Sequence, residues 1–337
     1  MRVAEVKTFG EVKRNFRRKE CVAQAGDEGA RRMTESQNNS KLWPYLALAA
    51  GITCIAWSAI FVRWTDMPGP ASAFYRLLIP AMLLAPTWFF PRHKSRLDRR
   101  SFAIITVGGL FFALDLAFFN TSILRTSAAN ATLLGNYSPV VVGLLTWLVF
   151  RRKPPSTFWL GLLLALVGTA AILWSDLSAH LGFGAGDAMA LAAAAFFAVY
   201  LMATEEVRST TSTLVFIRLA MVSSVFFLLL INVALGISLR IPAGHSWMAL
   251  LALGLITQLG GYMALTYALG HLPATVTSVS LLTQGPLTAV LAALFLSEKL
   301  TTPQISGGLL VLAGVGLANR RGSPEEEANA ILAHRDA

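Results

Sequence analysis

Long apolar runs, separated by short polar stretches, dominate the pattern of the chain between residues 42 and 319. A helix needs about 20 consecutive apolar residues to cross a bilayer. Ten runs come close to that length or exceed it. They cover residues 42–61, 69–90, 101–121, 126–150, 157–175, 188–204, 212–236, 246–269, 273–297 and 302–319. The pattern therefore predicts an all-α, polytopic membrane protein with ten transmembrane helices.

The polar ends of the chain are predicted to be cytoplasmic tails, residues 1–41 and 320–337. Residues 1–41 are basic and too polar to bury a core, which favours disorder. Apolar residues from Val3 to Phe16 keep a helical spacing beside lysines and arginines, which is typical of a short helix on anionic lipid. An equally open alternative is that the protein starts at Met33.

Basic residues predict the orientation of the chain in the membrane. Cytoplasmic loops of membrane proteins carry an excess of lysine and arginine. With a cytoplasmic N-terminus, 22 of the 28 lysines and arginines fall on the inner side and only four on the outer side. Both termini are therefore predicted to be cytoplasmic, in a cell inner membrane. The net charge of +10 then reports orientation and does not indicate a nucleic-acid partner.

Internal similarity divides the membrane region into two halves, 42–175 and 188–319. Aligning Pro139 in "GNYSPVVVGLL" with Pro286 in "LLTQGPLTAVL" places Asp115 opposite Tyr262. One residue is then deleted, and "GLLLALVG" (161–168) matches "GGLLVLAG" (307–314). Each half contains five runs, so the two copies must enter the membrane from opposite sides. This predicts two inverted five-helix repeats, an arrangement typical of secondary transporters.

The order of these features resembles a known family. Trp57, Arg76 in "AFYRLL", an alanine-rich fourth run ending "PVVVGLLTWL" and a glycine-rich fifth run are matched in the second half, where Arg218 stands in "VFIRLA". This order is similar to that of the drug/metabolite transporter superfamily, in its ten-helix EamA-type branch. The resemblance covers about residues 42–319. It implies transport of small organic metabolites, often by export.

Three charges lie within the predicted helices: Arg76, Asp115 and Arg218. Intramembrane charges usually face a partner or a water-filled cavity. At ~1.5 Å per residue, Arg76 and Asp115 both lie roughly 9–12 Å below the outer surface, so they can reach each other. Asp115 either binds a proton or a cationic group of the substrate, or forms a fixed pair with Arg76, or is solvated at the interface. Arg218 is either a structural partner of Glu205 and Glu206 or a gate charge.

Two prolines mark further candidate positions. Proline disrupts the helical hydrogen bond to residue i−4, so Pro139 and Pro286 predict kinks near the middle of the fourth and ninth helices. Polar residues precede each proline, and kinked helices with polar neighbours are typical of substrate sites. The alternative is that these groups serve helix packing alone. The predicted substrate-binding set is Trp57, Arg76, Asp115, Asn136, Tyr137, Tyr200, Gln258, Tyr262, Thr283 and Gln284, in which the aromatic residues either line a cavity or pack.

Several functional classes lack their motifs. The chain contains no Walker-type Gly-Lys loop and no G-x-S-x-G elbow, and its histidines are not at metal-ligand spacing. We therefore expect no enzyme activity, no cofactor and no metal. The predicted partners are a small-molecule substrate, the lipid bilayer and protons. The first prediction is export of amino-acid-like compounds by alternating access; the alternatives are uptake of S-adenosylmethionine or a vitamin-like metabolite, and a non-transporting membrane sensor or scaffold.

Overall fold

The computed structural model describes residues 42–88, 97–126, 128–149, 151–174, 183–242, 244–295 and 301–319. Residues 1–46 and 47–337 form two separate units, and the first is described only over its helical residues 42–46. The predicted tails, 1–41 and 320–337, lie outside the described residues. Helices, turns and loops account for all the described ranges, and no strand occurs in them. The all-α prediction is therefore confirmed.

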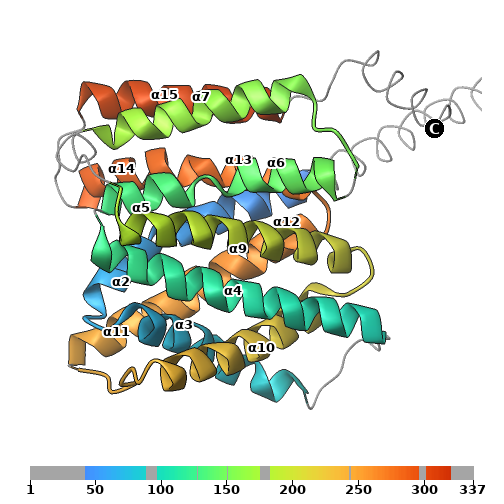
Figure 1. The fold of residues 1–337 in the computed structure, drawn as a ribbon, viewed down its shortest axis with the longest axis vertical. Coiled ribbons are helices and arrows are strands. Elements are labelled where there is room, and N and C mark those ends of the chain that lie inside the picture. Colours follow the sequence, from blue (N-terminus) through green and yellow to red (C-terminus); the bar gives the residue numbers. More distant parts are fainter. Residues whose placement is uncertain are drawn as a thin grey trace, which may run out of the picture. The chain divides into compact units, whose positions relative to one another are not determined.

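The second unit starts within a helix that continues to residue 56 and is followed by the elements labelled in Figure 1. These are α2 (Ser58–Trp64), α3 (Gly69–Leu84), η1 (Ala85–Trp88), α4 (Arg99–Arg125), α5 (Ala128–Gly135), α6 (Ser138–Leu148), α7 (Ser156–Ile172), α9 (Ala185–Arg208), α10 (Thr213–Ala234), α11 (Gly244–Ala252), η2 (Leu253–Tyr262), α12 (Met263–Leu269), α13 (Ala274–Ser280), η3 (Leu281–Thr283), α14 (Gln284–Phe295) and α15 (Thr302–Ala318).

Many of these helices are long and apolar enough to cross a membrane. Within the described residues, six such stretches are Leu42–Val62, Arg99–Arg125, Ala131–Leu148, Ala185–Arg208, Thr213–Ala234 and Gly244–Leu269. Two shorter apolar helices are Ser156–Ile172 and Thr302–Ala318. The protein is therefore a multi-pass membrane protein.

Helix α10 illustrates how an apolar helix divides its surface. Val222, Phe226, Leu229 and Val233 are exposed and recur every three or four residues, so they share one face of the helix. The opposite face is buried against α3 and α4. An exposed apolar stripe of this kind suits contact with lipid chains, since lipid does not penalise apolar exposure as water does.

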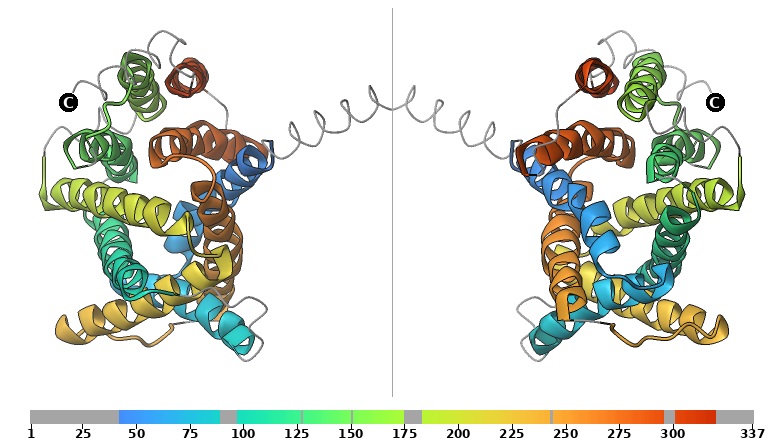
Figure 2. Two further views of the ribbon diagram at one scale, coloured as in Figure 1. Left: turned by 90° about the vertical axis from the view of Figure 1, so that its right-hand side faces the viewer. Right: turned by 90° about the vertical axis from the view of Figure 1, so that its left-hand side faces the viewer.

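Helices α7 and α15 pack side by side and antiparallel along one edge of the second unit (Figures 1 and 2). Gly161 lies against the backbone of Gly314, and Gly168 lies against the backbone of Gly307. A Cβ added to Gly168 would lie 2.6 Å from the Gly307 carbonyl oxygen, closer than real Cβ atoms approach. Glycine is therefore required here by the close approach of the two backbones, as is common between membrane helices.

Two asparagines fix the first turn of α3 between its neighbours. Asn120 of α4 donates through Nδ2 to the Ser72 hydroxyl at 3.0 Å and to the Gly69 carbonyl at 3.3 Å. Asn232 of α10 donates to the Pro70 carbonyl at 3.0 Å. Both asparagine side chains are fully buried. These bonds set the position of α3, which carries Arg76 one to two turns further along.

Besides the break at Trp57, three further helical runs are interrupted in the middle. Residues Asn136–Tyr137 form a turn between α5 and α6, and the 3₁₀ turn η3 separates α13 from α14. Pro139 and Pro286 lie in the first turns of α6 and α14, where a missing N–H leaves no helical bond unmade. The third interruption, the π-helix η2 between α11 and α12, has no proline and was not expected from the sequence.

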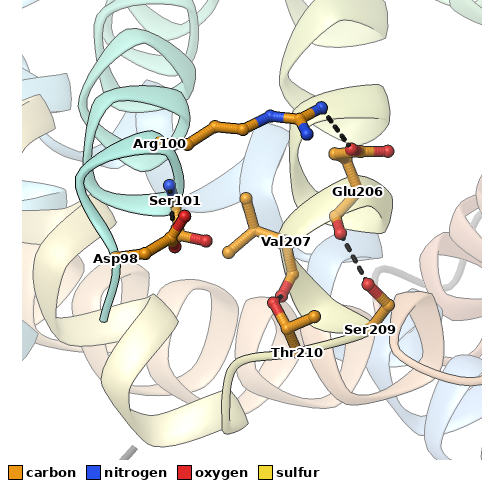
Figure 3. A network of polar contacts seen from close by, with 7 residues as sticks. All are labelled: Asp98, Arg100, Ser101, Glu206, Val207, Ser209 and Thr210. Atoms are coloured by element: carbon orange, nitrogen blue, oxygen red, sulfur yellow. Dashed lines mark hydrogen bonds and ion pairs between the residues drawn. The ribbon is translucent and has the colours of Figure 1, made fainter. Parts of the chain in front are cut away.

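One end of α4 is tied to the last turn of α9 by the polar network of Figure 3. Arg100 and Glu206 form an ion pair at 3.0 Å. Asp98 caps α4 by accepting a hydrogen bond from the Ser101 amide at 3.2 Å. Hydrogen bonds from Ser101 hold the pKa of Asp98 below its usual range, because they stabilise the ionised carboxylate.

Candidate functional site

Helix α3 carries Arg76 into the protein interior, where its side chain contacts two other helices, α2 and η2. The residue is 2% exposed. Its Nε donates to Gln258 Oε1 at 3.0 Å, and its Nη1 donates to the Ser58 hydroxyl at 3.0 Å. The guanidinium carbon lies 5.3 Å from the centre of the Tyr262 ring, in the geometry of a cation–π contact. These partners are all neutral, so they solvate the positive charge without cancelling it.

Two of these partners, Gln258 and Tyr262, belong to the π-helix η2. A π-helix is defined by hydrogen bonds between residues i and i+5. Such segments are rare, and they are frequently found at functional sites. The buried positions of η2 recur at a spacing of four, with Gly254, Gln258 and Tyr262 on one side. The wider turn therefore places the amide and the phenol on the face that meets α3.

Helix α4 supplies the acidic group. Asp115 is 8% exposed and lies on the buried face that also carries Phe112 and Leu116. The carboxylate is within electrostatic range of Arg76, as the depth argument predicted. Across the described residues, however, no Arg76 nitrogen lies within 4.0 Å of it and no group donates a hydrogen bond to it. Arg76 and Asp115 are thus neighbours that do not pair.

A cluster of aromatic rings covers the same region. Phe112 stacks on Tyr200 of α9, with ring centres 4.4 Å apart, and lies 4.9 Å from Tyr262. Phe197 of α9 adds contacts to Tyr200 at 6.2 Å and to Tyr262 at 6.5 Å. The structure therefore brings together Arg76, Asp115, Tyr200, Gln258 and Tyr262 of the predicted set.

Trp57 borders this region from the first helical run. It is half-buried at the break before α2 and stacks on Phe61, with ring centres 5.9 Å apart. Its neighbour Ser58 is the residue that binds Arg76. Sequence reasoning missed Ser58, although a serine directly after a tryptophan in an apolar run is a signal of the right kind.

The four polar residues before the prolines are half-buried or exposed, unlike Arg76. Tyr137 is 38% exposed, and Asn136, Thr283 and Gln284 are half-buried. The Thr283 hydroxyl donates to the Ser280 carbonyl within its own helical run at 2.7 Å. None of the hydrogen bonds or ring contacts among described residues joins these four to Arg76 or Asp115.

Arg218 of α10 contacts the short 3₁₀ helix η1, which follows α3. Its Nη1 donates to the carbonyl of Thr87 at 2.8 Å and to the Thr87 hydroxyl at 3.3 Å. The expected partners make other contacts: Glu206 pairs with Arg100, and Glu205 accepts from the Ala274 amide at 3.0 Å. Position along the chain did not predict this, because α4 and α13 approach the end of α9 from distant parts of the sequence.

A second buried arginine, Arg208, ends α9. The sequence indicated it only as one more cytoplasmic charge. The residue is 8% exposed; its Nε donates to the Thr266 carbonyl of α12 at 3.1 Å, and its Nη1 donates to the Thr211 carbonyl. Gly270 leaves room for the guanidinium, since an added Cβ would lie 2.5 Å from Nη2. Arg208 and Glu205 together attach the end of α9 to both sides of the α12–α13 connection.

Known proteins match the chain over most of its length. The model of the EamA-like transporter family matches twice, at residues 42–174 and 184–320. An uncharacterised transporter of Bacillus subtilis, YwfM, is 28% identical over 77% of this chain and 86% of its own length. The pseudopaline exporter CntI of Pseudomonas aeruginosa is 28% identical over 79% and 92%. A crystal structure of another protein shares the fold with a TM-score of 0.69, at 17% identity over 83% of this chain and 98% of the matched one.

Proposed function

Because this chain belongs to the EamA-like transporter family, we propose that it is a secondary transporter that exports amino-acid-like compounds by alternating access. The family and the matched relatives make it a membrane transporter of small metabolites and not an enzyme. Export is supported by the exporter among the relatives. Location in a cell inner membrane, with both termini cytoplasmic, is supported by the excess of basic residues on one side.

Alternating access in our proposal depends on ten helices in two inverted five-helix repeats, 42–175 and 188–319. Helix is found in each of the ten apolar runs, and the family model matches each half separately. Contacts between α7 and α15 add a third support. Gly161 aligns with Gly307 and Gly168 with Gly314, so the contacts Gly161–Gly314 and Gly168–Gly307 are related by exchanging the halves. Reciprocal contacts of this kind are expected across a two-fold axis.

The observation that carries the proposed function is the presence of Arg76 and Asp115 as buried, unpaired neighbours inside an apolar protein. Burying an ionised group without an opposite charge is costly, so such groups persist where a ligand or a proton completes them. Tyr200, Tyr262 and Gln258 form the remaining walls of the proposed substrate site. In this proposal protons are the coupling ion, and Asp115 is the group that exchanges them or binds a substrate cation.

The four residues at the proline breaks and Trp57 remain proposed cavity residues. The interruptions at Asn136–Tyr137 and at η3 lie in corresponding places of the two halves, which is where broken helices bind substrate in repeat transporters. Arg218 is proposed as a gate or structural charge, through its contact with Thr87.

Purified protein in proteoliposomes tests the function directly. Uptake and counterflow of radiolabelled amino acids, organic cations, vitamins and S-adenosylmethionine would be measured with and without a pH gradient. Export of amino-acid-like compounds predicts counterflow of amino acids that Arg76→Gln abolishes. Counterflow of S-adenosylmethionine or a vitamin instead would favour the uptake alternative, to which the carboxylate of Asp115 is suited. Absence of transport for all classes, with a folded protein, would favour a sensor or scaffold.

A further inference from the structure

We propose that Gln258 is a positioning residue that keeps the Arg76 guanidinium away from the Asp115 carboxylate, so that both charges stay available to a substrate that carries both signs. The inference rests on the proposed transport function and concerns the same site. It explains how two opposite charges can lie close together in an apolar interior without neutralising each other.

The first step is the choice of partners that Arg76 makes. Opposite charges attract strongly in a low-dielectric interior, and a buried arginine normally pairs with a nearby carboxylate. Here Asp115 is within electrostatic range, yet the described hydrogen bonds of Arg76 go to Gln258 and Ser58. The ring of Tyr262 covers one face of the guanidinium. Neutral groups therefore hold the cation in a place that the carboxylate does not reach.

The second step is that the segments carrying Gln258 and Ser58 contact each other directly, whereas Asp115 is carried by a different helix. Within the π-helix, Gly261 packs against Cys54 and Ile55 of the first helical run, and the Thr257 hydroxyl lies 3.4 Å from the Cys54 carbonyl. These contacts join η2 to the segment that ends in Ser58. Asp115 is carried by α4, which packs mainly on α9 and α10. Both acceptors of Arg76 thus come from segments that contact each other, and neither comes from α4.

The third step is the neutrality of the amide. A glutamate at position 258 would accept the same hydrogen bond but would cancel the positive charge of Arg76. Glutamine fixes the guanidinium and leaves its charge uncompensated. A ligand with a carboxylate and an ammonium group can then bind Arg76 with the first and Asp115 with the second, and the site as a whole remains neutral. A simple anion or a simple cation satisfies only one of the two residues.

A ligand-free stability experiment tests the positioning role. Thermal unfolding in detergent would be measured for the wild type, Gln258→Met, Asp115→Asn and the double variant. Methionine matches glutamine in length but offers no comparable acceptor. If Gln258 holds Arg76 off Asp115, its loss lets the two charges pair. Gln258→Met should therefore lower the Tm less in the wild-type background than in the Asp115→Asn background. The two decreases should differ by at least about 2 °C. An equal change in both backgrounds would overturn the proposal.

Two further variants keep the test decisive. Ser58→Ala removes the other restraint on Arg76, so it should show the same kind of dependence on Asp115. This test remains available even if Gln258→Met fails to fold. Leu250→Met on α11 introduces the same residue at a buried position that packs against Met67 and Ala71. It serves as the matched control and should show no dependence on Asp115. Dependence for Leu250→Met as large as for Gln258→Met would contradict a role specific to Gln258.

A transport measurement separates this inference from the proposed function. Counterflow of L-leucine would be competed with 4-methylpentanoate, which lacks the ammonium group, and with 3-methylbutylamine, which lacks the carboxylate. The wild type should prefer leucine over either analogue by at least tenfold, and Gln258→Met should lose most of the counterflow. If the wild type shows counterflow but the Tm effect of Gln258→Met does not depend on Asp115, only the positioning role of Gln258 is contradicted. If that dependence is found but no substrate is transported, the proposed function is contradicted and the positioning role is not.

Discussion

Two pairs of equivalent helices differ in how similar their two members are. In α7 and α15 the aligned glycines are the same in both halves, and they make reciprocal contacts. In α4 and the run α11–η2–α12 the aligned residues differ, since Asp115 stands opposite Tyr262. The backbone differs too: α4 is an uninterrupted α-helix of 27 residues, whereas its counterpart is broken by a ten-residue π-helix.

This difference separates a packing requirement that both halves share from residues that only one half supplies. Close packing of α7 on α15 depends on the absence of side chains, a requirement that is the same from both sides. The proposed site uses a carboxylate on one side and neutral hydrogen-bond partners on the other, which identical copies would not supply. We infer that the α7–α15 contact preserves the repeat while α4 and η2 have specialised.

The largest effect should come from breaking the symmetric contact. Gly168→Ala puts a Cβ 2.6 Å from the Gly307 carbonyl oxygen and 2.7 Å from the Val311 amide nitrogen, and neither backbone atom can move alone. We expect the free energy of unfolding to fall by up to about 3 kcal/mol, measured by thermal or denaturant unfolding in detergent. Gly316→Ala on α15 faces open space and is the control. Equal stability of the two variants would contradict the packing role.

The next effect should come from removing the charge that α4 has and its counterpart lacks. Asp115→Asn keeps the shape of the side chain, so we expect a folded protein whose transport efficiency falls at least tenfold, or about 1.4 kcal/mol. Vesicle counterflow would measure it. Asp98→Asn, at the exposed start of the same helix, retains a good capping residue and should transport normally. Normal transport by Asp115→Asn would remove the functional meaning of the asymmetry.

A smaller effect should distinguish two adjacent glycines of the π-helix. A Cβ on Gly261 would lie 2.8 Å from Ile55 Cγ1, a side-chain atom that can partly give way, so Gly261→Ala should cost about 1 kcal/mol. A Cβ on Gly260 meets nothing closer than 3.5 Å, so Gly260→Ala should be close to neutral. Unfolding of both variants in detergent would be compared. The reverse order would mean that η2 packs differently from the structure.

The smallest effect should come from the ion pairs near the starts of the two compared helices. Arg100 of α4 pairs with Glu206, and His245 of α11 lies 2.8 Å from Asp66. The side chains of Arg100 and Glu206 are 77% and 42% exposed, so water and salt screen the pair. A double-mutant cycle with Arg100→Gln and Glu206→Gln should give a coupling below about 1 kcal/mol that declines further with salt. A larger coupling that does not change with salt would indicate an ion pair shielded from solvent.

Much of this fold could be predicted from hydropathy, because the length and apolarity of a run decide whether it crosses a bilayer. The nearness of Arg76 and Asp115 followed from counting residues along neighbouring helices. The partners of Arg76 could not be predicted in this way, since Gln258 comes from a helix 182 residues further along the chain. The contact depends on the rotation of each helix about its own axis, which sequence spacing alone does not set.

The π-helix escaped prediction for a different reason. The residues "LGLITQLGGY" have an apolar pattern that fits an α-helix as well as a π-helix, and no proline marks the change. What decides the geometry is the packing of Gly254 and Gly261 against α3 and the first helical run. Such contacts exist only once the helices have assembled, so the local sequence carries little sign of them.

The last turn of α9 is attached to the corner between α12 and α13. Glu205 and Arg208 attach it to the first amide of α13 and to the middle of α12, so a displacement of α9 is expected to act on the corner between these helices. Tyr200 lies eight residues earlier on the same rigid helix, about 12 Å away along its axis. If a ligand at the proposed site displaced the Tyr200 ring, one continuous helix would transmit that displacement to the α12–α13 corner.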